Sequence, residues 1–207
     1  MLPPQPASPT TLGKLLANLH NKSQSPSGQF GFHIKTYHGK IPQNIDNWTT
    51  SWASLFTALI KPYLDLALSN RIFKDMCPNW QSKSSILSNL LLDKVIPRLL
   101  LPLQSNNRTL KPCLLHGDCW DGNTAEDPYS KPFLFDACSF YGHNEYDTGN
   151  WRAVRHKLSD EAYIQAYKKD FPVSEPAEDW DARNRLYSLT FNIGNALYIP
   201  GSEQAEV

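Results

Sequence analysis

Residues 113–136 read CLLHGDCWDGNTAEDPYSKPFLFD, and this stretch decides the fold class. An apolar run, Cys113–Leu115, opens it, and a second apolar run, Phe133–Phe135, closes it. The residues between the two runs are mostly polar and include two glycines and two prolines, which is the composition of a loop. We therefore predict two short strands that form a small β-hairpin around a functional loop.

The sequence on either side of this stretch has the patterns of helices. Leucines recur along one helical face between Leu12 and His20. Further helices are predicted at roughly Trp48–Leu59, Pro62–Asp75, Ser82–Leu103 with a kink at Pro97, Ser159–Lys169 and Asp179–Tyr198. We expect a mainly α-helical domain over residues 11–207, preceded by a disordered lead-in of residues 1–10.

Composition argues against several classes of protein. The 207 residues are 41% apolar, which is enough to bury a core and too much for a disordered tail. Lys+Arg and Asp+Glu number 20 each, so charge gives no reason to expect nucleic acid or an anionic membrane as a partner. The most apolar run, Val95–Leu103, is too short to cross a membrane. Because the N-terminus lacks the basic-then-apolar pattern of a secretory signal, we expect a cytoplasmic protein.

The cysteines leave a metal site open as an alternative. Cys113, His116 and Cys119 form a C-x2-H-x2-C pattern that zinc could use. We prefer isolated thiols in a reducing compartment, because no C-x-x-C pair is present.

The segment His116–Asn123, HGDCWDGN, carries the chemistry that we expect. Phosphoryl transfer needs a carboxylate near the acceptor hydroxyl and oxygen ligands that hold Mg2+ on the phosphates. Asp118 suits the first role, and Asn123 and Asp136 suit the second. The Asp-x4-Asn spacing equals that of the protein-kinase catalytic loop. His116 joins Asp118 as a candidate catalytic residue, with a hydrogen-bonded core histidine as the alternative.

The motif H-G-D-x4-N followed by a strand and Asp136 resembles the aminoglycoside- and choline-kinase-like phosphotransferases. Within them, the chain resembles the fructosamine and protein-ribulosamine 3-kinases, and HNEY at residues 143–146 resembles their fungal branch. The resemblance covers nearly the whole chain after residue 11, in family order, through LGKLLANLH (12–20), GQFGFH (28–33), IPQNIDNWTTSW (41–52), VIPRLL (95–100), residues 113–123, FLFDACSFYGHNEYDTGNW (133–151), SEPAEDW (174–180) and RNRLY (183–187).

This resemblance implies the C-terminal catalytic lobe of a protein-kinase-like phosphotransferase fold. It implies a transferase that moves the γ-phosphoryl group of ATP, with Mg2+, to the 3-hydroxyl of a ketosamine. A ketosamine is a sugar attached by glycation to a protein or to a free amine, and the pathway implied is deglycation repair. In the family, a β-rich N-terminal lobe precedes the helix that resembles Leu12–His20, and a further helix follows the position of Tyr198. We therefore expect a chain that lacks the N-terminal lobe and is shortened at its C-terminus.

Two other functions stay open. The chain could be a weak or inactive kinase fragment, because the family's phosphate-clamping elements are not in it. It could also be a small-molecule kinase of the choline or aminoglycoside type, which shares H-G-D-x4-N.

Four more residues are candidates for the site. Asp147 is expected either to bond the backbone of the catalytic loop or to cap a helix. Glu145 is expected to assist the acceptor site or to form a surface ion pair. Trp120 and His33 are expected to line the ketosamine pocket.

Overall fold

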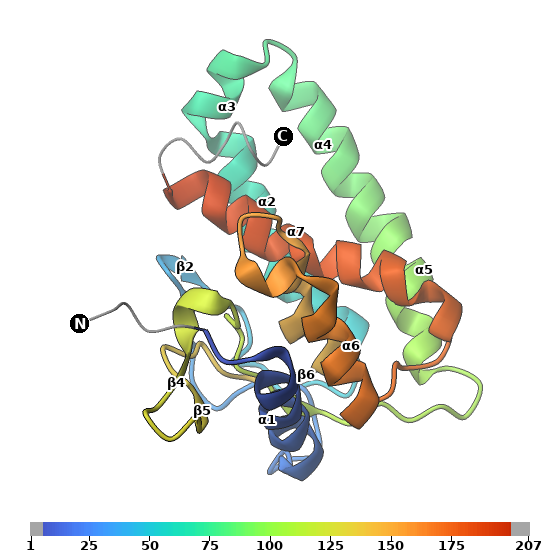
Figure 1. The fold of residues 1–207 in the computed structure, drawn as a ribbon. Helices are drawn as coiled ribbons and strands as arrows, with labels where there is room; N and C mark the ends of the chain where they lie inside the picture. Colours follow the sequence, from blue (N-terminus) through green and yellow to red (C-terminus); the bar gives the residue numbers. More distant parts are fainter. Residues whose placement is uncertain (1–5, 200–207) are drawn as a thin grey trace.

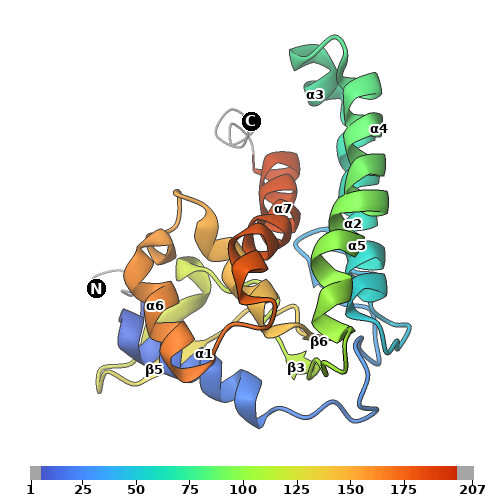
Figure 2. The ribbon, with the colours of Figure 1, turned by 90° about the vertical axis from the view of Figure 1, so that its right-hand side faces the viewer.

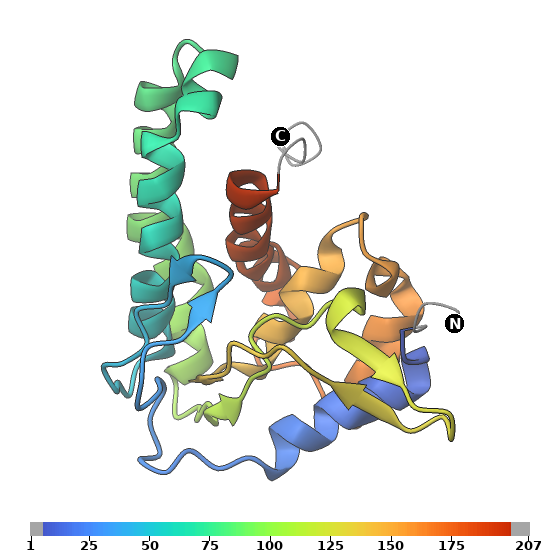
Figure 3. The same ribbon diagram turned by 90° about the vertical axis from the view of Figure 1, so that its left-hand side faces the viewer.

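The computed structural model describes residues 6–199, without the side chain of Met76. Figure 1 shows a mainly helical molecule, as the sequence predicts. It holds three small two-stranded sheets where one hairpin was predicted. The α-helices are α1 (Pro9–Lys22), α2 (Trp52–Ser69), α3 (Arg71–Met76), α4 (Trp80–Leu90), α5 (Ile96–Leu100), α6 (Glu161–Asp170) and α7 (Trp180–Tyr198). The antiparallel helices α2 and α4 lie side by side and project to one end of the molecule, with α3 at the tip (Figures 2 and 3).

The helix α1 begins earlier than the sequence predicts. Ser8 is its N-cap, and Pro9, with its fixed φ, occupies the first helical turn. Ala7 is fully buried, and the Ser8 backbone N–H donates to Glu126 at 2.9 Å. The expected disordered lead-in is therefore wrong for residues 7–10, and its first five residues lie outside the described part.

The helix α2 continues through Pro62, where a break was predicted. A proline inside a helix removes one backbone hydrogen bond and crowds the preceding turn. The residues on both sides of it, Leu59, Ile60, Tyr63 and Leu64, are buried. Burial of this apolar face outweighs the local cost, so the break between the two helices falls at Asn70 and not before Pro62.

The helical stretch predicted for Ser82–Leu103 is wound in three different ways. A π-helical turn, Leu91–Val95, joins α4 to α5, and a 3₁₀ turn, Leu101–Gln104, follows α5. Pro97 lies just after the π-helical turn, so the change in winding occurs where the kink was predicted.

The strands pair differently from the predicted hairpin. The strand β3 (Cys113–Leu114) pairs with β6 (Tyr141–Gly142), whereas β5 (Pro132–Leu134) pairs with β4 (Thr124–Glu126). A turn centred on Asp127, whose carboxylate accepts two backbone N–H groups, gives β5 a partner close by in sequence. The third sheet is a hairpin of β1 (Tyr37–His38) and β2 (Ile41–Pro42).

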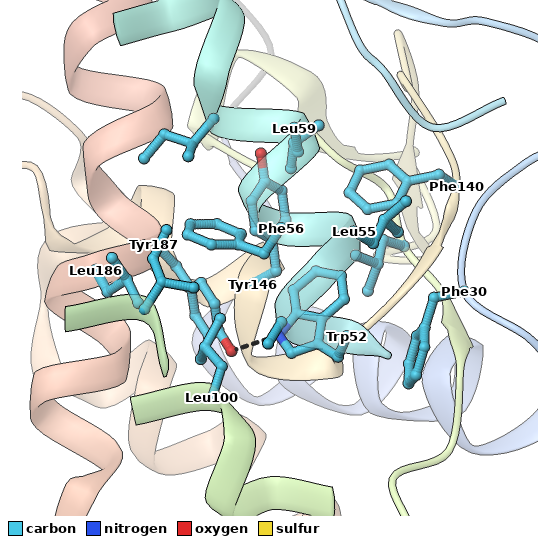
Figure 4. Packing of buried hydrophobic residues seen from close by; sticks show 14 of the residues in the cluster. Phe30, Trp52, Leu55, Phe56, Leu59, Leu100, Phe140, Tyr146, Leu186 and Tyr187 are labelled. Atoms are coloured by element: carbon cyan, nitrogen blue, oxygen red, sulfur yellow. Dashed lines mark hydrogen bonds between the residues drawn. The ribbon is translucent and has the colours of Figure 1, made fainter. Parts of the chain in front are cut away.

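The main core lies between α2, α5, α7 and the 3₁₀ helix η4 (Asn144–Arg152). Figure 4 shows its aromatic centre, where the Trp52 indole N–H donates to the Tyr187 hydroxyl at 2.8 Å. Both side chains are fully buried, so each polar atom needs this partner. A second apolar cluster joins α1 to α6. The two clusters hold η4 and the loop after β3 between them.

The last two helices agree with the sequence prediction. Asp160 caps α6, whose final turn carries Lys168 and Lys169. The helix α7 begins one residue after the predicted start and ends at the predicted residue, Tyr198. Among residues 6–199, no helix combines the length and apolar character needed to cross a bilayer.

Candidate active site

The loop after β3 is held by one buried carboxylate, Asp147 of η4. Its Oδ2 accepts the His116 backbone N–H and its Oδ1 accepts the Gly117 backbone N–H, both at 2.8 Å. His20 of α1 bonds the same carboxylate at 3.1 Å. Burial opposes ionisation of Asp147, but the hydrogen bonds from His20 and from the Gly117 N–H outweigh it, so its pKa lies below the usual value. Asp147 thus makes the backbone contact considered from the sequence.

His116 contacts backbone on both sides of its ring. The Asp118 N–H donates to Nδ1 at 3.2 Å, so Nδ1 is an acceptor and Nε2 carries the proton. The Nε2–H then donates to the Phe135 carbonyl at 2.9 Å. Because both nitrogens are engaged and the residue is 3% exposed, His116 ties the loop to the segment after β5. This geometry corrects the catalytic role proposed for it and matches the alternative, a hydrogen-bonded core histidine.

Gly117 has to be glycine. Its φ is 85°, in the left-handed region, and a Cβ there would lie 2.5 Å from the Cys138 carbonyl oxygen. This close approach lets the loop turn at Gly117 and present Asp118.

The Asp118 carboxylate has polar neighbours at both oxygens. The Asn123 amide nitrogen donates to Oδ2 at 3.2 Å, and the Asn150 amide nitrogen donates to Oδ1 at 3.1 Å. His38 of the β1–β2 hairpin has its Nε2 3.4 Å from the same Oδ1. The side chain of Asp118 is 21% exposed, so it is oriented by the protein and still reached by solvent.

Asn123 and Asp136 offer oxygens that suit a hard cation. The Asn123 amide nitrogen donates to the carbonyls of Asp118 and Asp136, at 3.0 and 3.5 Å, and these bonds turn its oxygen away from them. Among residues 6–199, no group donates to that oxygen and no side chain bonds the exposed Asp136 carboxylate. The bond from the Asn123 amide to the Asp136 carbonyl keeps the two side chains close to each other. A neutral amide oxygen and a carboxylate fit the ligand preference of Mg2+.

A cavity of about 380 Å3 opens beside Asp118. Its walls come from the β1–β2 hairpin, the loop after β3, η4, the loop that follows η4, and α7. The lining residues are His38, Asp118, Trp120, Asn150, Arg155, His156, Phe191, Asn195 and Ile199.

Trp120, which we expected to line the ketosamine pocket, forms part of the wall of this cavity. Its ring folds over Gly122, where any side chain would collide with the indole. On its other side, the indole contacts the His156 ring, with centroids 5.1 Å apart. Burial lowers the pKa of His156, which favours the neutral ring, although nearby Asp121 acts in the opposite direction.

Two sequence-predicted residues lie outside the cavity. Glu145 is 2% exposed, and Arg183 donates to both of its oxygens at 2.7 and 2.9 Å. It is therefore neither an acceptor-site residue nor a surface ion pair, because its whole carboxylate serves a buried salt bridge. His33 is exposed, with its ring against Phe32, and does not line the cavity. The histidines that line it are His38 and His156.

The C-x2-H-x2-C pattern of the cysteine alternative does not gather into a site. Burial raises the pKa of Cys113 to about 11 and raises that of Cys119 well above its usual value. Within residues 6–199, no group of three or more His, Cys, Asp or Glu side chains is arranged to hold a metal ion.

Comparison with known proteins identifies the family. The family model described as fructosamine kinase matches residues 2–203. The chain belongs to the fructosamine kinase family. Protein-ribulosamine 3-kinase, chloroplastic, of Arabidopsis thaliana is 31% identical over 86% of this chain and 48% of its own length. A probable ketoamine kinase of Staphylococcus aureus is 32% identical over 88% of this chain and 58% of its own length. This fructosamine kinase family member thus spans about half the length of these curated relatives.

Solved structures share the fold of this family member. A candidate fructosamine-3-kinase from Thermobifida fusca matches the whole chain and 68% of its own chain, with a TM-score of 0.68 and 20% identity. A second candidate, from Haemophilus somnus, covers the whole chain with a TM-score of 0.67 at 21% identity.

Proposed function

We propose that this chain carries the catalytic lobe of a kinase that phosphorylates the 3-hydroxyl of a ketosamine, protein-bound or free, with ATP. The observation that carries the proposal is the Asp118 carboxylate, oriented at the mouth of the cavity beside Asn123 and Asp136. The names of the relatives, a protein-ribulosamine 3-kinase and a ketoamine kinase, support the acceptor class.

In the proposed reaction, the oxygen of the acceptor hydroxyl forms a bond to the γ-phosphorus of ATP. The bond from that phosphorus to the oxygen bridging to the β-phosphate breaks, and ADP leaves with the electron pair. Asp118 accepts the hydroxyl proton and then releases it to water, which leaves ADP, the 3-phosphate and one proton. Asn150 and Asn123 hold the carboxylate in the orientation that receives this proton.

Asn123 and Asp136 are the residues that would hold Mg2+. Bound there, the cation would neutralise charge on the phosphates. No side chain among residues 6–199 bonds the Asp136 carboxylate, so it is free to ligate a cation. The backbone of Asp136 has a left-handed φ of 56°, a strained conformation that is concentrated at functional sites.

The proposed role is deglycation, since a 3-phosphate makes the sugar–amine adduct labile. We include a cytoplasmic location in this proposal; the Arabidopsis relative is described as chloroplastic.

The test is phosphate transfer from labelled ATP to a ribulosamine-bearing protein and to free ribuloselysine. The chain is assayed as printed and as a fusion that adds the N-terminal lobe expected for the family. Asp118→Ala should abolish turnover, whereas Asp65→Ala, which removes an exposed carboxylate on α2, should leave it unchanged. Turnover of Asp118→Ala near the wild-type rate would remove Asp118 from the role of base.

The same assay separates the alternatives. Turnover by the fusion alone would mean that the printed chain is an incomplete kinase. Turnover of choline or an aminoglycoside, with none of the ketosamine, would refute the proposed acceptor.

A further inference from the structure

Asn150 is a buried cavity residue that the sequence analysis did not select. It lies near the end of η4, is 3% exposed, and lines the cavity beside Asp118. Its amide nitrogen donates to Asp118 Oδ1 at 3.1 Å. An ionised carboxylate only accepts hydrogen bonds, so the amide must turn its nitrogen toward Asp118 and its oxygen away.

The amide oxygen of Asn150 has no hydrogen-bond donor among residues 6–199, although it is buried. Buried polar atoms in folded proteins nearly always have a partner, and one without a partner is destabilising. The atom belongs to a side chain that lines the cavity, so a bound molecule can supply the missing donor.

This oxygen belongs to a side chain that bonds Asp118, and that placement narrows the choice of donor. Two acceptors, a carboxylate oxygen and an amide oxygen, are presented by side chains that bond to each other. Two hydroxyls on neighbouring carbons form a corresponding pair of donors that also lie close together. In a ketosamine, the 3-hydroxyl has the 4-hydroxyl as such a neighbour.

We propose that Asn150 is a specificity-determining residue that accepts a hydrogen bond from the hydroxyl next to the one that is phosphorylated. The acceptors favoured by this site are therefore vicinal diols, with one hydroxyl on Asp118 and its neighbour on the Asn150 amide oxygen. This inference rests on the proposed function and adds the feature of the substrate that the site reads. Asn150 also positions Asp118 through its amide nitrogen, so its loss acts on both binding and turnover.

The test compares ribuloselysine with its 4-deoxy analogue as substrates. It uses whichever form of the protein, the chain or the fusion, shows turnover. The wild type should prefer the parent compound by at least about tenfold in kcat/KM, because a site built to bond a hydroxyl rejects an analogue without it. In Asn150→Leu, which removes both amide atoms, the preference should fall to less than about twofold, with KM for the parent raised. Calorimetry of both compounds without ATP should give the same change in preference.

Three controls keep the outcome decisive. Asn150→Ser replaces the leucine variant if that protein does not fold. Asn184→Leu removes a buried asparagine that bonds Thr148 of the same 3₁₀ helix outside this cavity, and it should lose stability and keep the preference. The Mg2+ concentration at half-maximal rate should be unchanged in Asn150→Leu.

Five results overturn the inference. The wild type could turn over both compounds equally, Asn150→Leu could keep the preference, or Asn184→Leu could lose it. A changed Mg2+ midpoint with an unchanged preference would make Asn150 a metal ligand instead. Failure of the wild type to bind or phosphorylate the parent compound refutes the proposed function, and the inference with it.

Discussion

Replacing Arg183 by methionine tests whether Glu145 is a structural carboxylate. Arg183 is 0% exposed and Glu145 is 2% exposed. Without the guanidinium, Glu145 keeps the Ser174 N–H at 2.9 Å, and the carbonyls of Ser174 and Pro176 each lose a donor. Leaving a buried carboxylate unpaired costs about 3–5 kcal/mol. In a domain of this size that corresponds to a fall in Tm of about 6–20 °C.

Thermal and urea unfolding, followed by circular dichroism, measure this effect. The matched control is Arg185→Met, which removes an exposed partner of Asp181 on the same helix and should cost less than about 1 kcal/mol. The double variant Arg183→Met/Glu145→Leu should recover much of the loss, because the stranded charge is gone. Equal Tm values for Arg183→Met and Arg185→Met would refute the reasoning, as would a double variant no more stable than Arg183→Met.

Three other substitutions test the protonation, the cation site and the loop. Burial lowers the pKa of His143 to about 4 from 6.5, so the stability it contributes is present above pH 6.5 and is lost as pH falls toward 4. Between pH 7 and pH 5 the wild type should lose about 2 kcal/mol more unfolding free energy than His143→Gln, and equal losses would contradict this. Asp136→Asn should raise the Mg2+ midpoint for activity more than Asn123→Ala, because a charged ligand contributes more to a hard dication, and equal midpoints would contradict the assignment. Gly117→Ala should destabilise the fold by about 2 kcal/mol in urea titrations. The control Gly39→Ala should cost less, because the φ of Gly39 is also left-handed, at 58°, but a Cβ there would meet open space. Equal destabilisation would mean that the contact with the Cys138 carbonyl contributes nothing.

The closeness of Asp118 and Asn123 could be predicted because both lie in a short stretch of sequence. Asp118 and Asn123 are five residues apart, and a 3₁₀ turn over Asp121–Asn123 brings the amide back to the carboxylate. The helices that carry most of the fold were predictable for a similar reason. Their apolar residues recur at the helical period over many turns, as in α1 and α7.

The strand partners could not be predicted, because each strand has only two or three residues. Such runs are too short to show an alternating pattern of apolar and polar residues. That pattern is what fixes how one strand pairs with another. The three residues of β4, Thr124–Glu126, resemble a loop in sequence. The same limit hid His38 and Asn150, because each reaches Asp118 only through the tertiary fold.

The hydrogen bond from His20 to Asp147 has a consequence for the synthesis of the protein. The two residues are 127 positions apart, and α1, which carries His20, packs on α6 near residue 165. A growing chain therefore exposes the HGD loop well before the groups that hold it have been made. Because contacts between distant residues form late in folding, the apolar face of α1 stays uncovered until α6 has been translated.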